Sequence, residues 1–480
     1  MKAKWVFLVF WLLFTWEANG QGNAAQISAA KFMINGALNG ASVGIVVADA
    51  TNGLILGEVH PNLLLAPASA AKLITSAAAF DRLGAEYRFE TPLLIEGSLD
   101  ISTGIVTGNL VIRGAADPTL GSSWFNQNRF PDTFFPEIAS VLAEAGLKAV
   151  HGDIVVDLSD FEHWAIPDKW VWEDVGNYYG SAAYGLNIFD NTLRLYFDTP
   201  ATPDAPVRLV SQLPATENLM WVNEIRSSVV NRDMAYVYGS PWDSRRVLRG
   251  TLPLNRKGFE VKAALPEPPE VFGKMLAMAL TAKGIEINGS IVTTKVRHEG
   301  TSLYSFISPP LSEICSLLHY ESVNLIGEAL VLELGRVTSG YGSRAEGLKA
   351  ISSFMQTNVT SQPLFLDDGS GLSRFSLVSA RQLNDLLRYM HLGPNSGTFK
   401  STIPVAGTGT MRVFSSTRFP GTSLRAKSGS MTRVRAYAGY LMANSGRELT
   451  FSIIANNFPG THQEIIKAIE DLLWEIKVAY

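Results

Sequence analysis

Cysteine is almost absent from this chain: only Cys315 occurs among its 480 residues. A single cysteine cannot form an intrachain disulfide, so the stability of the fold must come from packing. Cys315 lies in the stretch LSEICSLLHY, an apolar pattern with helical spacing, and is predicted to be a buried packing residue.

A basic surplus is also missing. The chain has 40 Lys and Arg against 44 Asp and Glu, for a formal net charge of −4. This balance gives no support for nucleic-acid binding, and no block of like charge indicates a disordered tail. The 7 histidines are scattered without metal-ligand spacing such as His-x-x-x-His, which disfavours a zinc enzyme. We expect no metal and no cofactor.

Long apolar runs are confined to the N-terminus. Lys2 and Lys4 precede WVFLVFWLLFTW, and small residues come next at Ala18 and Gly20. This order is typical of a secretory signal peptide over residues 1–20, cleaved near Gly20. The alternative is a retained membrane anchor, but the run is short for a bilayer. We therefore predict an exported protein of the periplasm or cell envelope without a membrane span; its oligomeric state is not indicated.

The remaining composition, 46% hydrophobic and 18% charged, is that of a globular protein with two or three cores. A hairpin is predicted over 42–59, where Asn52-Gly53 supplies the turn. The other expected elements are a helix over 69–83 ended by Gly84, strands within 88–113, helices at 311–319, 322–337, 343–356 and 379–392, and two late strands followed by a helix from Thr461. The early and late thirds therefore resemble one α/β domain, with roughly 200 residues inserted between them.

The last helix, HQEIIKAIEDLLWEIKVAY, is amphipathic. A membrane-surface role is one interpretation. Packing on the sheet is favoured, because the helix comes directly after a strand and its polar face carries charges of both signs.

The tetrapeptide SAAK occurs twice, at Ser28 to Lys31 and at Ser69 to Lys72. Ser-x-x-Lys places a hydroxyl and an amine one turn apart on a helix, where the amine can take the hydroxyl proton. The pattern is expected about twice by chance in a chain of this length. Context must therefore distinguish the two copies.

The second copy has the setting that such chemistry needs. Lys72 lies among Ala, Leu and Ile, so we expect partial burial, which favours the neutral amine. Pro67 suits a loop entering a helix, and backbone N–H groups at a helix start can stabilise an oxyanion. The alternative is a lysine that reaches solvent from an Ala-rich helix. The first copy is predicted to be an ordinary helix surface with Lys31 in solvent.

Two further motifs occur later in the chain. Ser322 and Asn324 form one Ser-x-Asn in YESVNLIGEAL, and Lys427 to Gly429 form Lys-Ser-Gly in RAKSGSM. Each is weak alone, but Ser-x-x-Lys, Ser-x-Asn and Lys-[Ser/Thr]-Gly in this order are the motif set of the penicillin-recognising serine enzymes.

With these motifs, the chain resembles the penicillin-binding protein 4 family of D-alanyl-D-alanine carboxypeptidases and endopeptidases. The segments GAADPTLG, WEDVGNYYGSAAYGLNIFDN, DDGSGLSR and PVAGTGTMR are also similar to that family. The resemblance implies an α/β (α+β) transpeptidase- or β-lactamase-like domain with two nested, mainly β inserted domains. The expected boundaries are 1–20 for the leader, 21–87 and 299–480 for the transpeptidase-like domain, 88–111 and 188–298 for the middle domain, and 112–187 for the innermost one.

The resemblance also implies roles for the motif residues. Ser69 would attack the D-Ala-D-Ala carbonyl and become acylated, and Lys72 would take its proton. Ser322 would relay a proton to the leaving amine with the help of Lys427. Asn324 would hold the substrate's peptide amide and contact Lys72.

The Lys-Ser-Gly segment is implied to bind the substrate. Ser428 and Lys427 would receive the terminal carboxylate. Gly429 would leave room for the substrate backbone. The backbone N–H groups of Ser69 and Ser430 would form the oxyanion hole.

Some positions depart from the family, and others match positions that bind substrate only in some members. Ser428 stands where the family usually has Thr. The serine keeps the hydroxyl and lacks the methyl group. Asp157 in VDLSDF and Arg374 in GLSRF match positions that bind the diamino-acid side chain of the stem peptide in some members. Asp157 has the alternative of an ordinary solvated turn residue. Thr432 stands where some relatives have an amide, so specificity can differ.

The sequence therefore predicts a serine D-alanyl-D-alanine carboxypeptidase or endopeptidase that acts on peptidoglycan stem peptides and is inhibited covalently by β-lactams. A β-lactamase or esterase on the same scaffold is the alternative enzyme, but no residue for fast deacylation is evident. A non-catalytic cell-wall-binding protein is the alternative from another class, and the complete motifs disfavour it.

Overall fold

The computed structural model describes residues 24–125, 133–216, 219–240 and 242–480. The chain folds into two compact units. The first comprises the described part of Met1–Ala85 with Cys315–Ser322 and Ala350–Tyr480, and the second comprises the described parts of Glu86–Ile314 and Val323–Lys349. The predicted leader, residues 1–20, lies outside the described residues. The finer division of 88–298 into two nested domains stays a prediction.

The first unit is built on a five-stranded antiparallel sheet with the order β2-β1-β22-β21-β20. The strands are β1 (Ser42–Asp49), β2 (Ile55–Val59), β20 (Leu424–Met431), β21 (Val434–Met442) and β22 (Glu448–Asn456). The predicted hairpin at Asn52-Gly53 is confirmed, and Gly53 has the positive φ of +75° that such a turn requires. The first and last parts of the chain thus share one sheet, because β1 pairs with β22.

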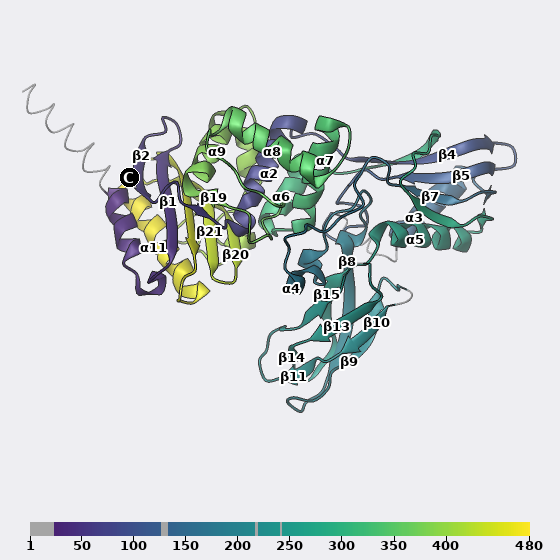
Figure 1. Ribbon diagram of the computed structural model, residues 1–480, viewed down its shortest axis with the longest axis horizontal. Coiled ribbons are helices and arrows are strands. Elements are labelled where there is room, and N and C mark those ends of the chain that lie inside the picture. The colour runs from purple at the N-terminus through teal and green to yellow at the C-terminus, as the bar shows by residue number, and fades with distance from the viewer. Residues whose placement is uncertain (1–23, 126–132, 217–218, 241) are drawn as a thin grey trace, which may run out of the picture. The chain divides into compact units, whose positions relative to one another are not determined.

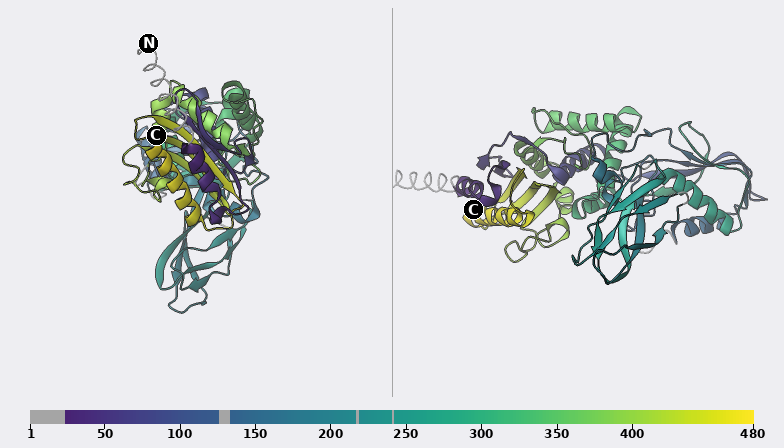
Figure 2. Two further views of the ribbon diagram at one scale, coloured as in Figure 1. Left: turned by 90° about the vertical axis from the view of Figure 1, so that its left-hand side faces the viewer. Right: turned by 60° about the horizontal axis from the view of Figure 1, so that its bottom comes forward.

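Helices cover both faces of this sheet (Figures 1 and 2). The helix at 24–33 and α11 (His462–Ala479) pack their apolar sides on one face, in a core with Phe32, Ile453 and Leu472. α2 (Lys72–Leu83) and α9 (Ala380–Leu392) lie on the other. The prediction that the last helix packs on the sheet is confirmed. Within the described ranges, no helix has the length and apolarity needed to cross a bilayer.

The helices after Pro310 form where the apolar periodicity predicts them. They are α6 (Leu311–Tyr320), α7 (Asn324–Ser339), α8 (Arg344–Asn358) and α9. The short α10 (Ser396–Ser401) that comes next was not predicted. Ser379 and Gln382 form a capping box that starts α9, and Thr461 and Glu464 form one that starts α11. Cys315 is fully buried on α6, as predicted.

The helix predicted from Ser69 begins differently. Ala68–Ala71 form a 3-10 turn, η2, and the α-helix starts at Lys72. Ala68, at the entry to this turn, has a φ of +47°, which neither a 3-10 helix nor an α-helix accommodates in its interior. The predicted end at Gly84 is confirmed by its φ of +85° and by its N–H bond to the Phe80 carbonyl.

The second unit is mainly β. Its largest sheet holds β16, β6, β5, β4 and β18 in that order, with β7 between β5 and β17. Smaller sheets have the orders β15-β8-β9, β10-β13-β12 and β11-β14. The strands are β4 (Glu90–Asp100), β5 (Ile105–Arg113), β6 (Ala149–Val150), β7 (Ile154–Asp157), β8 (Thr192–Thr199), β9 (Arg208–Leu213), β10 (Met220–Asn223), β11 (Arg226–Ser228), β12 (Tyr236–Tyr238), β13 (Arg245–Arg249), β14 (Thr251–Pro253), β15 (Arg256–Ala264), β16 (Glu286–Ile287), β17 (Ile291–Thr294) and β18 (Thr301–Ile307).

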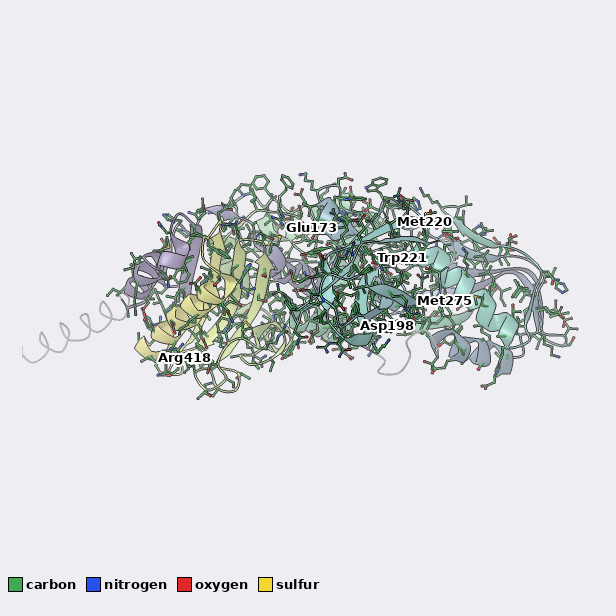
Figure 3. All side chains as sticks on the ribbon, turned by 90° about the horizontal axis from the view of Figure 1, so that it is seen from below. Glu173, Asp198, Met220, Trp221, Met275 and Arg418 are labelled. Carbon is green, nitrogen blue, oxygen red and sulfur yellow. The ribbon has the colours of Figure 1, made fainter. Side chains whose placement is uncertain are left out.

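Helices α3 (Phe134–Glu144) and α5 (Pro268–Ala282) pack together in this unit. A core of Phe134, Phe135 and Phe272 joins them, and Met275 on α5 and Trp221 on β10, labelled in Figure 3, pack against the same core. The remaining short elements are β3 (Leu64–Leu65), β19 (Val378–Ser379), α4 (Trp172–Val175), η1 (Gly36–Leu38), η3 (Tyr178–Gly180), η4 (Phe189–Asn191) and η5 (Gly409–Met411).

Candidate active site

The second SAAK copy brings its hydroxyl and amine together. Lys72 Nζ lies 3.0 Å from Ser69 Oγ and donates a second hydrogen bond to the backbone oxygen of Ser370 at 2.7 Å. The Lys72 side chain is fully buried, while Ser69 is partly exposed on η2. The expected burial of Lys72 is thus confirmed and is complete. This arrangement offers a serine oxygen to solvent with an amine in hydrogen-bonding contact behind it.

The loop around Ser370 packs directly on the nucleophile turn. Gly371 has a φ of +74°, and a Cβ there would lie 2.0 Å from the backbone oxygen of Ala68. Asp368, fully buried, accepts hydrogen bonds from the backbone N–H groups of Gly371 at 3.0 Å and Ser373 at 2.6 Å. The Ser370 carbonyl was not a predicted site residue, because a backbone oxygen has no sequence signature; the Gly-Ser-Gly run was the available signal.

A second lysine joins Ser322 to the Lys-Ser-Gly motif. Lys427 Nζ lies 2.9 Å from Ser322 Oγ and 2.8 Å from its neighbour's backbone oxygen, that of Ser428. Ser322 has a φ of +61°, an uncommon conformation for a residue with a side chain. Lys427 is fully buried, and burial together with the positive charge of Lys72 holds the pKa of Lys427 well below its ordinary value. The two lysines are therefore electrostatically coupled.

The Lys-Ser-Gly residues lie on the last strand of the sheet. β20 pairs with β21 on one side, and residues 404–406 hydrogen-bond to its other side around Leu424 and Ala426. At Gly429 the strand touches the nucleophile turn, since a Cβ would lie 2.3 Å from the Pro67 oxygen. Ser428 is buried and Ser430 is exposed. Glycine is required here for the approach of β20 to η2.

Asn324 belongs to the second unit, where it begins α7. Its amide nitrogen donates a hydrogen bond to the backbone oxygen of Tyr179 at 2.7 Å. This bond joins the start of α7 to η3, within the segment WEDVGNYYGSAAYGLNIFDN.

The two residues predicted to bind the stem-peptide side chain lie in different units. Asp157 is fully buried in the second unit at the end of β7. Its carboxylate accepts from Ser159 N at 2.9 Å, His298 N at 3.0 Å and Arg113 Nε at 3.3 Å, and this burial excludes the alternative of a solvated turn residue. Arg374 lies in an exposed turn of the first unit. The ligand role of both residues stays a prediction, although the contacts of Asp157 favour a structural role.

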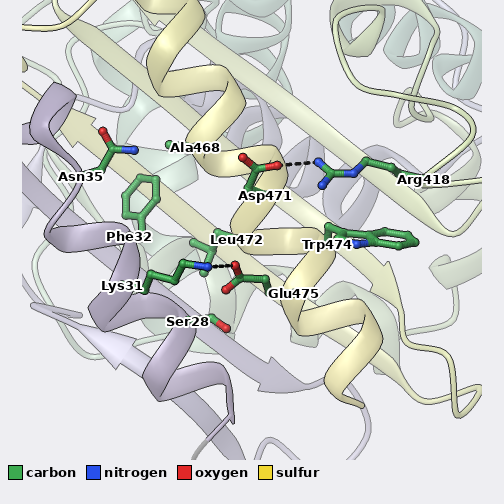
Figure 4. Close-up of a pocket in the computed structure, with 10 residues that line it drawn as sticks. All are labelled: Ser28, Lys31, Phe32, Asn35, Arg418, Ala468, Asp471, Leu472, Trp474 and Glu475. Carbon is green, nitrogen blue, oxygen red and sulfur yellow. Dashed lines mark hydrogen bonds and ion pairs between the residues drawn. The ribbon is translucent and has the colours of Figure 1, made fainter.

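The first SAAK copy has a different environment (Figure 4). Lys31 is 67% exposed and pairs with Glu475 on α11, which raises the pKa of Lys31. Together with Ser28, it lines a cavity of about 290 Å³ that a second ion pair, Arg418 to Asp471 at 2.6 Å, also borders. The prediction of a solvated Lys31 is confirmed, although Ser28 itself is buried beneath it. A lysine held in its charged form by a carboxylate is a poor proton acceptor.

Metal-binding side chains do not cluster in the part of the chain that the structure describes. Over those ranges, no three His, Cys, Asp or Glu side chains are grouped so as to hold a metal ion. The reactive groups that the structure brings together are hydroxyls and amines.

Known proteins resemble this chain along nearly its whole length. The model of the D-Ala-D-Ala carboxypeptidase 3 (S13) family matches residues 25–476. The D-alanyl-D-alanine carboxypeptidase of Actinomadura sp. strain R39 is 30% identical over 441 residues, which cover 88% of this chain and 79% of that protein. DacB of Haemophilus influenzae is 25% identical over 434 residues, with 87% and 86% covered.

A solved structure has the same fold as this chain. Penicillin-binding protein 4 (dacB) from Haemophilus influenzae superposes with a TM-score of 0.79 at 22% identity, over 92% of this chain and 98% of that chain. The predicted transpeptidase-like fold class is thereby confirmed. The extent of the family match and the 30% identity to a carboxypeptidase show that this chain is a member of the D-Ala-D-Ala carboxypeptidase 3 (S13) family of serine-type hydrolases.

Proposed function

We propose that this protein is an exported DD-peptidase that cleaves the D-alanyl-D-alanine ends of peptidoglycan stem peptides through an acyl-enzyme on Ser69. The observation that carries the proposal is the 3.0 Å contact between Lys72 Nζ and Ser69 Oγ. A serine hydroxyl is a weak nucleophile until a neighbouring base removes its proton. Lys72 is the base within reach.

The two lysines share the protons that this chemistry needs. Two like charges buried close together do not both ionise readily, and the lowered pKa of Lys427 favours a neutral amine in the pair. The substrate's terminal carboxylate, bound beside Lys427 and Ser428, would stabilise a positive charge on Lys427. Lys72 would then be the neutral member when substrate is present, as the base must be.

The reaction would proceed in two steps. Ser69 Oγ gives its proton to Lys72 Nζ and forms a bond to the penultimate D-alanine carbonyl, whose oxygen takes the negative charge against the N–H groups of Ser69 and Ser430. The C–N bond then breaks, and the leaving amine takes a proton from Ser322 Oγ, which Lys427 replaces across 2.9 Å. Water would afterwards give a proton to Lys427 as its oxygen bonds to the ester carbon. The bond from that carbon to Ser69 Oγ would break, and Lys72 would return its proton to Ser69 Oγ as the shortened peptide leaves.

The remaining predicted residues would orient the substrate. Asn324 would hold the peptide amide, and Gly429 keeps the edge of β20 within reach of the nucleophile turn. Arg374 is exposed, as a residue that recognises the stem-peptide side chain would have to be. Whether the product is a shortened stem peptide or an opened cross-link depends on whether the leaving amine belongs to free D-alanine or to a second stem peptide, and we propose both activities.

The proposal extends to inhibitors and location. Penicillin-binding protein 4 of Haemophilus influenzae has been solved in complex with a β-lactam, and we propose β-lactams as covalent inhibitors of this chain. We also propose export with removal of residues 1–20, which N-terminal sequencing of the protein from cell-envelope fractions would test.

Labelling with a fluorescent penicillin tests the proposal. The full chain should form a slowly released covalent adduct, located on Ser69 by peptide mass spectrometry. Ser69→Ala should abolish the adduct. Ser28→Ala, the matched serine of the other SAAK copy, should leave labelling unchanged.

Each other outcome has a defined meaning. An adduct on another residue would overturn the assignment of the acyl-enzyme to Ser69. No adduct at all would overturn the acyl-enzyme proposal and favour a wall-binding role. Rapid release of hydrolysed drug would favour a β-lactamase.

A further inference from the structure

A histidine near the lysine pair is hydrogen-bonded at both ring nitrogens. His319, on α6, is fully buried; its Nε2 lies 2.9 Å from Ser76 Oγ and its Nδ1 lies 2.9 Å from Thr402 Oγ1. A neutral imidazole has one donor and one acceptor, and a hydroxyl can supply either role, so both contacts are satisfied. The sequence pattern did not mark this residue, because it ends an apolar helical stretch.

The ring joins three segments that each lead to a motif. Ser76 lies on α2, one turn after Lys72. His319 itself precedes Ser322 by three residues. Thr402 begins the segment that pairs with β20, since Ala426 N donates to the Pro404 oxygen at 3.1 Å immediately before Lys427. One imidazole therefore connects the supports of the Ser-x-x-Lys, Ser-x-Asn and Lys-Ser-Gly residues.

The charge state of the ring suits this place. Burial, together with the positive charge of Lys427, lowers the pKa of His319 to about 3. The ring is therefore neutral over the working pH range and adds no charge beside the lysines. A carboxylate here would form an ion pair with them, and an apolar ring of similar size would connect nothing.

We propose that His319 is a positioning residue for the reaction, which holds α2, the Ser322 turn and β20 in the register that brings Lys72 to Ser69 and Lys427 to Ser322. Its ring contacts Ser76 and Thr402 rather than the reacting hydroxyls of Ser69 and Ser322, so it acts through the lysine-bearing segments. The inference rests on the proposed acyl-enzyme function.

The test compares variants of the full chain on an N-acylated peptide ending in D-Ala-D-Ala. His319→Phe keeps a ring packed edge-on against Phe399, whose centroid lies 6.0 Å from that of His319. It leaves Ser76 and Thr402 with other acceptors, the oxygens of Leu73 and Phe399. We expect kcat to fall about 100-fold, the scale of a small misplacement of reacting groups, with KM unchanged.

Conservative variants separate positioning from general packing. His319→Asn retains a polar group on the Thr402 side and His319→Gln one on the Ser76 side, and each should recover about tenfold of the lost kcat. Ser76→Ala with Thr402→Val should reproduce the loss, and adding His319→Phe to that pair should cost little more, because the three residues act as one unit.

The matched control is His462→Phe. His462, at the start of α11, also lies edge-on to a phenylalanine of the first unit, Phe458, with ring centroids 5.2 Å apart. It should change neither kcat nor KM.

The outcomes are distinguishable. If the unmodified chain forms no penicillin adduct, the proposed function fails. If it does form the adduct, the positioning role is overturned by either of two results: His319→Phe leaves kcat unchanged, or it changes KM as much as kcat. If His319→Phe does not fold, the combined Ser76→Ala and Thr402→Val variant is the test. An unchanged kcat in that variant would overturn the role.

Discussion

Lys427 Nζ lies 2.9 Å from Ser322 Oγ, although 105 residues separate them in the chain. The serine lies in a tight turn after α6 and the lysine on the outermost strand of the sheet. Their contact joins the serine of the second motif to the lysine of the third, while the first motif is held by the bond from Lys72 to Ser69. Substitutions of the lysines, and of the residues that bring them to the serines, test this assembly.

Lys72→Arg should slow acylation strongly while preserving a positive charge. A guanidinium stays protonated at any working pH and cannot accept the Ser69 proton. We expect the rate of penicillin adduct formation to fall about 10²- to 10⁴-fold, the usual contribution of a general base. Lys31→Arg is the control and should label at the normal rate, since Lys31 is a solvent-exposed partner of Glu475.

Gly429→Ala should displace the nucleophile turn. The new Cβ would lie 2.3 Å from the Pro67 oxygen and 3.0 Å from the Ala70 nitrogen, so β20 and η2 must separate. Labelling should slow about 100-fold, because a shift of this size misplaces Ser69 against its base. Gly397→Ala, on α10 with nothing within 4 Å of its Cβ position, should label normally; equal rates for the two variants would contradict the prediction.

Ser428→Thr should change activity by no more than a few-fold, since the hydroxyl that is proposed to bind the carboxylate remains. Ser428→Ala should instead raise KM for a D-Ala-D-Ala peptide about tenfold or more, as expected for loss of a hydrogen bond to a charged group. A steady-state comparison of the two variants checks this. Equal KM values would show that the hydroxyl does not meet the substrate.

His319 should not titrate between pH 5 and 8. Its folded pKa is lowered, so below about 6.5 the unfolded chain binds a proton that the folded chain does not. Above pH 6.5 this ring is neutral in both states and leaves the free energy of unfolding unchanged. As the pH falls from 6.5 toward 3, proton binding stabilises the unfolded chain, and the free energy of unfolding decreases by about 1.4 kcal/mol per pH unit. The Cε1–H NMR signal of His319, assigned with His319→Asn, should stay constant over that range, and a midpoint near 6 would contradict it.

Asp157→Asn should lower thermal stability without changing side-chain selectivity. Three internal donors already occupy the buried carboxylate, and weakening them should cost about 1–3 kcal/mol. The check compares thermal unfolding with the kcat/KM ratio for stem peptides bearing a free or an acetylated side-chain amine. A collapse of that ratio with intact stability would instead establish Asp157 as the ammonium ligand.

Several features were predictable because they depend on local chemistry. The hairpin at Asn52-Gly53, the helix end at Gly84 and the helix start after Thr461 each result from the conformational preference of one or two residues. The 3-10 turn at Ala68–Ala71 was not predictable. The positive φ of Ala68 accompanies packing against Gly371 and Gly429, residues some 300 positions or more further along the chain.

The sequence by itself determined the motif set, its order and the family, since these depend only on which residues occur where. It could not distinguish the two SAAK copies by their letters. Tertiary structure decided that Lys31 faces Glu475 in solvent while Lys72 is buried against Ser69 and the Ser370 oxygen. The reason is physical: the protonation of a lysine depends on its solvation and on the charges around it, and both come from segments far away in the chain.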